Sequence, residues 1–408
     1  MVWDLKRFGD VCDFVRGPFG GSLKKSIFKP DGHAVYEQQH AIYNQFEDIR
    51  YFIDKEKFSE MSRFELKPND LIMSCSGTMG KIAIVPNGIK QGIINQALLK
   101  LTPKDTLLPV FLKLWMDSPN FQQQIEAMSQ GAAIKNMASV KILKEIKVPV
   151  PKVSEQQRIV AILDQAFADI EKARANAEKN LKNARELFDS YLNQVFSQRG
   201  KGFELKIFGD VCHFVRGPFG GSLKKSIFKQ SGYAVYEQQH AIYDQFESIR
   251  YFIDKEKFSE MARFELKPGD LIMSCSGTMG KIAIVPEGIK QGIINQALLK
   301  LTPSELLIAE YLKFWMTSRN FQEQIESLSQ GAAIKNMASV KILKEIEVPV
   351  LKIEEQVRIL SKLKRLFKKC KSIEDMYAKK LESLDELKKS LLQKAFSGEL
   401  TKAEGHAA

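Results

Sequence analysis

Four polar segments of the chain contain residue types that bind phosphates or the edges of nucleic-acid bases. Residues 16–25 combine cations with glycines that would let the backbone approach a phosphate closely, and residues 74–81 place serine, threonine and lysine around a glycine-rich turn. Residues 37–40 read Glu-Gln-Gln-His and could pair with adenine or cytosine edges, and residues 130–136 form a polar loop of similar character. The alternative interpretation of each segment is a solvated turn or a polar strand rim.

Every one of these segments recurs 200 residues later, so the candidate contact residues form pairs. We predict contacts to an anionic ligand of this kind at Arg16, Ser22, Lys24, Lys25, Gln38, Gln39, His40, Ser76, Thr78, Lys81, Gln130, Lys135 and Asn136, and at Arg216, Ser222, Lys224, Lys225, Gln238, Gln239, His240, Ser276, Thr278, Lys281, Gln330, Lys335 and Asn336.

Residue patterns that would support catalysis are missing. The run Gly77-Thr-Met-Gly-Lys81 lacks the spacing and the trailing hydroxyl of a nucleotide-binding P-loop, and no Asn-Pro-Pro-Tyr run typical of an amino-methyltransferase occurs. Cys75 and His40 could be imagined as a nucleophile pair, but a cysteine beside an apolar strand is usually buried core. No two-carboxylate site of nuclease type and no cysteine or histidine spacing typical of a metal site is present. We expect a chain without catalytic activity, metal or cofactor of its own.

The composition indicates an anionic partner. The 408 residues carry a formal net charge of +12, and the five cysteines are simplest to interpret as reduced thiols. No apolar run approaches the length of a membrane span, and the first residues do not resemble a signal peptide. We expect a soluble, cytoplasmic protein.

The chain is an internal repeat with an offset of 200 residues. Residues 8–150 and 208–350 differ at 23 of 143 positions, whereas the segments that follow each copy have diverged further. A period this long indicates two copies of a whole globular domain. Within a copy the pattern predicts a mixed α/β domain with strands near 34–42, 71–74, 81–85, 93–101 and 145–150, helices at 54–61, 107–117 and 119–128, and a polar loop at 129–137.

A long helix is predicted after each domain. Residues 154–197 contain no glycine or proline, and Ser154 with Gln157 has the spacing of a capping box. Apolar or small residues then alternate in steps of four and three, as in a coiled coil, with one extra four-residue step. This seam is Ile159, Leu163, Ala166, Ile170, Ala173, Ala177, Leu181, Ala184, Phe188, Tyr191 and Val195.

The second long helix repeats this pattern, including the extra step, which favours two matched helices packed together over a plain core stripe. Its seam is Ile359, Leu363, Leu366, Cys370, Ile373, Tyr377, Leu381, Leu384, Leu391 and Ala395, and only Lys388, beside Leu387, interrupts it.

Several motifs, in this order and twice, resemble the specificity (S) subunit of type I restriction-modification systems. They are residues 74–81, Asn95-Gln-Ala97, residues 130–139, Val148-Pro-Val-Pro151 and Glu155-Gln-Gln-Arg-Ile159, and the second copy departs only at Leu351 and Val357. The resemblance implies two target recognition domains and two antiparallel helices that form a spacer. It also implies a non-catalytic subunit that binds double-stranded DNA, two methyltransferase (M) subunits, which would hold S-adenosylmethionine, and translocating restriction (R) subunits.

On this basis the fold class is two α/β (α+β) domains joined by two long antiparallel coiled-coil helices with pseudo-two-fold symmetry. The domains are residues 1–152 and 199–352, the spacer helices are 153–198 and 353–400, and 401–408 form a flexible tail. Candidate contacts to the methyltransferases are Gln156, Arg158, Gln356 and Arg358.

The near identity of the two copies predicts an interrupted palindromic target, because symmetric readers face inverted half-sites. Three substituted pairs could make the halves differ: Asp13/His213, His33/Tyr233 and Asn44/Asp244. The alternatives are a coiled-coil scaffold whose basic domains bind protein or RNA, an S subunit of a methylation-only system, and, least favoured, an enzyme.

Overall fold

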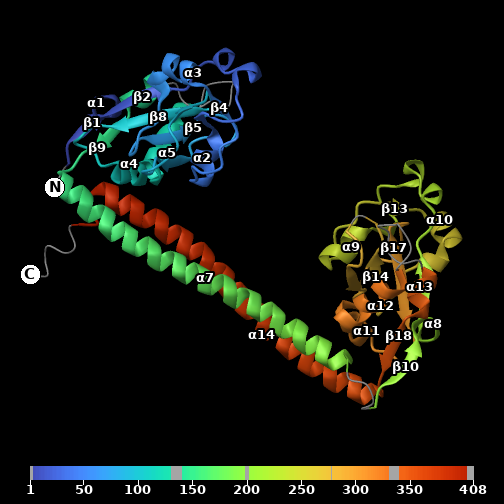
Figure 1. The fold of residues 1–408 in the computed structure, drawn as a ribbon. Helices are drawn as coiled ribbons and strands as arrows, with labels where there is room; N and C mark the ends of the chain where they lie inside the picture. The colour runs from blue at the N-terminus through green and yellow to red at the C-terminus, as the bar shows by residue number, and fades with distance from the viewer. Residues whose placement is uncertain (1–2, 130–139, 198–201, 277, 330–339, 402–408) are drawn as a thin grey trace, which may run out of the picture. The chain divides into compact units, whose positions relative to one another are not determined.

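The computed structural model describes residues 3–129, 140–197, 202–276, 278–329 and 340–401 (Figure 1). The chain divides into two compact units, one formed by residues 1–178 with 378–408 and the other by residues 179–377. Each unit contains one globular domain together with part of each long helix. The predicted contacts at Gln130, Lys135, Asn136, Gln330, Lys335 and Asn336, with most of the predicted loop at 129–137, lie outside the described residues.

The first domain is built on two small sheets and a two-stranded ribbon. The four-stranded antiparallel sheet has the order β2-β8-β5-β6, and the three-stranded sheet has the order β4-β3-β7, with β3 and β7 parallel. The strands are β1 (Leu5–Arg7), β2 (Cys12–Arg16), β3 (His33–Tyr36), β4 (Phe52–Ile53), β5 (Leu71–Ser74), β6 (Ile82–Ile84), β7 (Gly92–Ile94), β8 (Leu98–Pro103) and β9 (Lys147–Pro149), which pairs with β1.

Short helices cover these sheets, and a long helix leaves the domain. They are α1 (Phe8–Val11), α2 (Gln38–Tyr43), α3 (Lys55–Glu60), α4 (Pro109–Met116), α5 (Pro119–Ser129), α6 (Val140–Glu145) and α7 (Val153–Ser197).

The second domain repeats the same order of elements. Its strands are β10 (Glu204–Ile207), β11 (Cys212–Arg216), β12 (Tyr233–Tyr236), β13 (Phe252–Ile253), β14 (Leu271–Ser274), β15 (Ile282–Ile284), β16 (Gly292–Ile294), β17 (Leu298–Pro303) and β18 (Glu347–Val350). Its helices are α8 (Phe208–Val211), α9 (Gln238–Tyr243), α10 (Lys255–Glu260), α11 (Ala309–Thr317), α12 (Arg319–Ser329), α13 (Val340–Glu345) and α14 (Ile353–Ser397).

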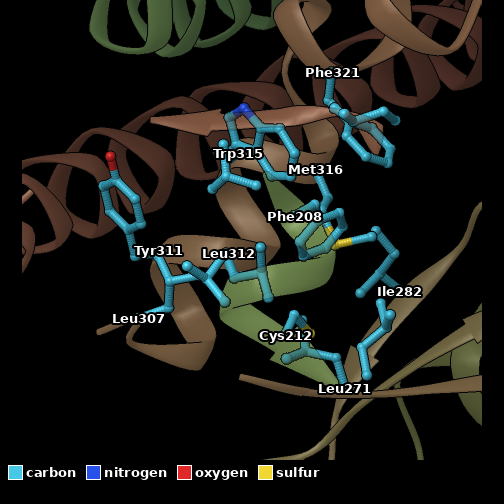
Figure 2. Close-up of a cluster of buried hydrophobic side chains, with 14 of the residues drawn as sticks. Phe208, Cys212, Leu271, Ile282, Leu307, Tyr311, Leu312, Trp315, Met316 and Phe321 are labelled. Carbon is cyan, nitrogen blue, oxygen red and sulfur yellow. The ribbon is translucent and has the colours of Figure 1, made fainter. Parts of the chain in front are cut away.

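Aromatic side chains from α8, α11 and α12 lie within the main core of the second domain. The rings of Phe208 and Trp315 are in an edge-to-face arrangement with 5.2 Å between centroids, and the ring of Phe321 lies 4.8 Å from that of the same tryptophan (Figure 2). Leu360 and Leu363 of α14 belong to this cluster. Because the long helix contributes to the domain's own core, the helix and the domain are held together by apolar packing.

The two long helices pack against each other in antiparallel directions within each unit (Figure 1). In the first unit Arg174 pairs with Asp385, and Lys388 lies 3.7 Å from Glu171, so numbers rise along α7 as they fall along α14. In the second unit the rings of Phe188 and Phe367 are 5.2 Å apart. The predicted fold class is therefore confirmed.

The predicted seam is correct except at two positions of α14. Ile373 is exposed, and the acidic Glu374 takes the half-buried place beside it, where it pairs with Arg185. Lys388 does not interrupt the seam, because its ammonium group sits 4.9 Å from the ring centroid of Phe167. The neighbouring Leu387 is exposed.

Several local predictions differ from the structure. The strand expected at 34–42 ends at Tyr36 and turns into α2, and the strand expected at 93–101 is two strands of different sheets. The domain's first strands and α6 were not predicted. Helix α7 begins at Val153, which places Ser154 inside the first turn and not at a capping position.

Candidate nucleic-acid interface

Three strand ends of the first domain meet at one edge, where β8 begins. The amide of Gly17, directly after β2, donates to the carbonyl of Leu98 at 2.9 Å, and the amide of Cys75, directly after β5, donates to that of Ala97 at 2.8 Å. The end of β3 joins them, because the amide of Asn95 donates to the carbonyl of Tyr36 at 2.9 Å. The segments at these strand ends, residues 16–25, 37–40 and 75–81, therefore emerge together, and we name this region the loop edge.

One buried hydroxyl shapes the glycine-rich turn of the loop edge. Ser74 Oγ donates to the carbonyl of Thr78 at 2.6 Å and accepts the amide of Lys81 at 3.0 Å. Gly77 and Gly80 have φ angles of +60° and +76°, values that favour glycine. The turn leaves Ser76, Thr78 and Lys81 exposed. Their counterparts Ser276, Thr278 and Lys281 are exposed as well.

The glutamines of the loop edge are half-buried and already partly bonded. Gln38 Oε1 accepts a hydrogen bond from Ser76 Oγ at 3.0 Å, and Gln39 Nε2 donates to the carbonyl of Asp48 at 3.3 Å. Gln238 and Gln239 repeat both bonds. Each amide keeps further hydrogen-bonding capacity for a ligand.

His40 and His240 do not belong to a contact surface, so their predicted role is wrong. Both imidazoles are buried, at 0% and 1% exposure. Nδ1 of His40 accepts the amide of Glu37 at 2.8 Å, so Nε2 carries the proton and donates to the carbonyl of Asp48 at 3.2 Å. The side chain closes the first turn of α2 and ties it to the following loop.

The basic segment of the loop edge is exposed and holds no acid. Arg16, Ser22, Lys24 and Lys25 are all exposed, and so are Arg216, Ser222, Lys224 and Lys225. Among the residues that the structure describes, no ion pair involves any of these cations or Lys81 and Lys281. The one acid of the loop edge, Glu37, accepts two hydrogen bonds from Arg50, at 2.9 and 2.8 Å, and the pair raises the pKa of that guanidinium. The loop edge therefore presents positive charge to an anionic ligand.

Position 17 requires glycine, because the backbone at Asn95 of the same chain passes close to it. A Cβ atom there would lie 1.8 Å from the carbonyl oxygen of Asn95. Asn95 also caps its own turn, because its Oδ1 accepts the amide of Ala97 at 3.0 Å. Gly17 and Asn95, which belong to two of the segments singled out in the sequence, therefore fix the backbone of the loop edge.

Cys75 is a core residue and no nucleophile. It is 2% exposed, and burial raises the pKa of its thiol to about 11. A thiol with so high a pKa is almost fully protonated at neutral pH, and the buried imidazole of His40 is bonded to backbone groups.

None of the three substituted pairs expected to distinguish the halves lies at the loop edge. Asp13 and His213 are opposite Thr102 and Thr302, toward the other end of the sheet. His33 and Tyr233 stand at the beginning of their strands, where each ring stacks on a phenylalanine, at 4.0 and 4.1 Å between centroids. The second substitution therefore preserves a packing contact.

The third pair is an exchange of ion-pair partners. Asp244 accepts a hydrogen bond from Lys313 at 2.8 Å in the second domain. In the first domain the corresponding residue is the neutral Asn44, and Lys113 pairs with Asp117 at 2.7 Å instead. Position 317, the counterpart of Asp117, is a threonine. The change of ion-pair partner explains the exchange of Asn44 for Asp244 without a change in base preference.

Comparison with known proteins decides the family. The type I restriction modification DNA specificity domain matches twice, over residues 2–179 and 200–383. The chain belongs to this family. It is a specificity subunit with two copies of a DNA specificity domain.

Specificity subunits of known systems align along most of the chain. The EcoBI subunit of Escherichia coli is 25% identical over 69% of this chain and 64% of its own length, so the chain spans less than two thirds of that relative. The EcoKI subunit of Escherichia coli strain K12 is 22% identical over 86% of this chain and 78% of its own length.

Two solved structures share the fold of this specificity subunit. A chain from a study of the assembly and conformational transition of the type I R-M system has a TM-score of 0.78, with 19% identity over 98% of both chains. The HsdS subunit from Thermoanaerobacter tengcongensis has a TM-score of 0.63, with 19% identity over 98% of this chain and 97% of its own length.

The first turns of the spacer helices correct a second prediction. Gln156 and Gln356 are fully buried and cannot contact a methyltransferase in this structure. Gln156 Oε1 accepts the amide of Leu108 at 2.9 Å, and its Nε2 donates to the carbonyls of Thr106 and Pro151, each at 2.8 Å. Gln356 makes the equivalent bonds. Arg158 and Arg358, two residues further along each helix, are exposed, and their predicted role stays a prediction.

Proposed function

We propose that this specificity subunit reads an interrupted inverted repeat in double-stranded DNA, with the loop edge of each domain on one half-site. The observation that carries the proposal is the placement of the 23 differences between the copies. Residues 14–29, 34–43, 70–86 and 88–103, which contain the described parts of the loop edge, are identical to their counterparts. Two identical reading surfaces should prefer the same bases.

The chemistry of the loop edge suits this task. Lysine and arginine at positions 16, 24, 25 and 81 would bind phosphates and position the domain without reading sequence. The amides of Gln38 and Gln39 can donate to and accept from an adenine edge, and Ser76 holds Gln38 in place. Inverted order would follow from the antiparallel helices, because a two-fold axis that exchanges the helices also exchanges the two domains and matches the dyad of the duplex.

The remaining parts of the proposal concern the assembly. The paired helices α7 and α14 would act as the spacer that sets the number of unread base pairs. Two methyltransferase subunits, which would carry S-adenosylmethionine, would dock near Arg158 and Arg358, and restriction subunits would join where the system cleaves DNA. Such an assembly would act in the cytoplasm, and none of the described helices is both long and apolar enough to span a membrane.

Sequencing of modified bases in the host genome tests the proposal. We expect one methylated motif that depends on this gene and consists of two half-sites, each the reverse complement of the other, around a gap of fixed length. A motif with two unrelated half-sites would contradict identical reading, and the loss of no motif on deletion of the gene would contradict a role in methylation.

A further inference from the structure

One apolar side chain at the loop edge of each domain points into solvent. Phe19 and Phe219 are each 92% exposed, more than any other large apolar side chain among the described residues. Single exposed apolar residues are common on protein surfaces. Here the same exposure recurs in both domains, and the backbone on either side of the ring is anchored.

The loop that carries Phe19 is anchored on both sides. On one side Gly17 donates to Leu98 and has no room for a side chain, and on the other side Leu23 is buried in a small core with Val35 and Ile93. Between these anchors the amide of Ser22 donates to the carbonyl of Phe19 at 2.8 Å and closes a tight turn. The ring is therefore presented by a fixed backbone.

The charge around the ring favours one kind of partner. Residues 14–29 contain no aspartate or glutamate, and the exposed cations Arg16, Lys24 and Lys25 lie within six residues of Phe19 along the chain. A purely apolar partner would leave these cations without compensation on binding. A duplex satisfies both requirements, because its phosphates neutralise the cations while its stacked bases accept an apolar ring.

We propose that Phe19 and Phe219 act as wedges, each inserting part-way between two adjacent base pairs of its half-site. The proposal rests on the function proposed above. Apolar side chains that enter a base step unstack it and bend the duplex, and the energy needed depends on the sequence of the step. The wedge would therefore contribute to recognition at a step without hydrogen bonds to the bases.

Fluorescence of 2-aminopurine, which increases on unstacking, tests the wedge. The full chain, assembled with its methyltransferase, is saturated with duplexes of the methylated motif that carry the probe at one position at a time. We expect an increase at one step in each half-site that disappears in the double variant Phe19→Ala, Phe219→Ala. Either single variant should remove about half of the increase, because the complex binds a palindrome in two orientations. The double variant should also lose about tenfold to a hundredfold in affinity for the motif.

Two further variants keep the test specific. Phe19→Leu with Phe219→Leu should retain most of the increase, because leucine also serves as a wedge. Leu5→Ala with Leu205→Ala removes apolar side chains that are 60% and 48% exposed on β1 and β10, away from the loop edge, and should change neither measurement. If no step shows an increase that depends on Phe19 and Phe219, the increases come from the methyltransferase, and the wedge is overturned.

Other outcomes would also overturn the proposal. Normal DNA binding by the wild-type complex without a fluorescence increase at any step would contradict the wedge and leave the proposed function standing. A loss of affinity in the alanine variant without a fluorescence change would assign the ring to a groove contact instead. Absence of binding to any duplex would contradict the proposed function and the wedge together.

Discussion

At the scale of single residues, the loop edge separates groups that face a ligand from groups that build the turn. The sequence shows which side chains could bind phosphates or bases, and the structure shows that the cations and hydroxyls among them are exposed. It does not show that His40 is buried, because its two hydrogen bonds go to Glu37 and Asp48, and the second depends on how the chain returns after α2. A polar side chain with a buried backbone partner looks the same in the sequence as one that binds a ligand.

The lysine of the glycine-rich turn provides a test at this scale. We expect the double variant Lys81→Ala, Lys281→Ala to bind all DNA sequences more weakly, because each lysine would contact one phosphate. The slope of log K against log salt should become shallower by about 0.9 for each lost contact, or about 2 for the pair. A filter-binding titration over salt concentration measures it.

Lys55→Ala with Lys255→Ala is the matched control. These lysines are exposed on α3 and α10, which follow β4 and β13 at the opposite end of β3 and β12 from the loop edge. Their removal changes the net charge equally and should leave the slope nearly unchanged. An unchanged slope in the Lys81 variant as well would show that the turn does not contact phosphates.

At the scale of elements, each spacer helix is joined to its domain by one buried glutamine in addition to apolar packing. Gln156 satisfies an amide and two carbonyls at the point where the chain enters α7, and its bond to the carbonyl of Pro151 is buried while the other two are partly buried. We expect Gln156→Ala to destabilise the first unit by about 2 kcal/mol or more, because each unpaired buried group costs about 1–3 kcal/mol.

Urea unfolding followed by circular dichroism measures this change. The neighbouring Gln157→Ala is the control, because Gln157 is exposed and its removal should change the free energy of unfolding by less than about 0.5 kcal/mol. Equal stability of the two variants would show that the glutamine does not join helix and domain.

The long helices were the most predictable elements and the small strands the least. A seam repeated over 45 residues is a local signal that few alternatives can imitate. Strands β1 and β9 are three residues each and pair across more than 130 positions of sequence, so only the folded domain defines them. The strand expected at 93–101 divides at Asn95, whose side chain caps a turn that hydropathy alone does not reveal.

At the scale of the whole molecule, the internal repeat was the strongest prediction, and the structure adds where the copies differ. The exchange of His33 for Tyr233 preserves a stacking contact, and the changes at positions 44/244 and 117/317 move an ion-pair partner. The segments of the loop edge are unchanged between copies. Substitutions have therefore accumulated away from the surface that we assign to DNA, which is the central reason to expect two identical half-sites.

Binding to three duplexes tests this claim most directly. The full chain, assembled with its methyltransferase, is titrated with one half-site alone, with two half-sites in inverted order, and with two in direct order at the same gap. We predict that the inverted repeat binds tightest, by at least about tenfold over the direct repeat, because only inverted order lets both loop edges engage at once. Equal or tighter binding of the direct repeat would contradict the account.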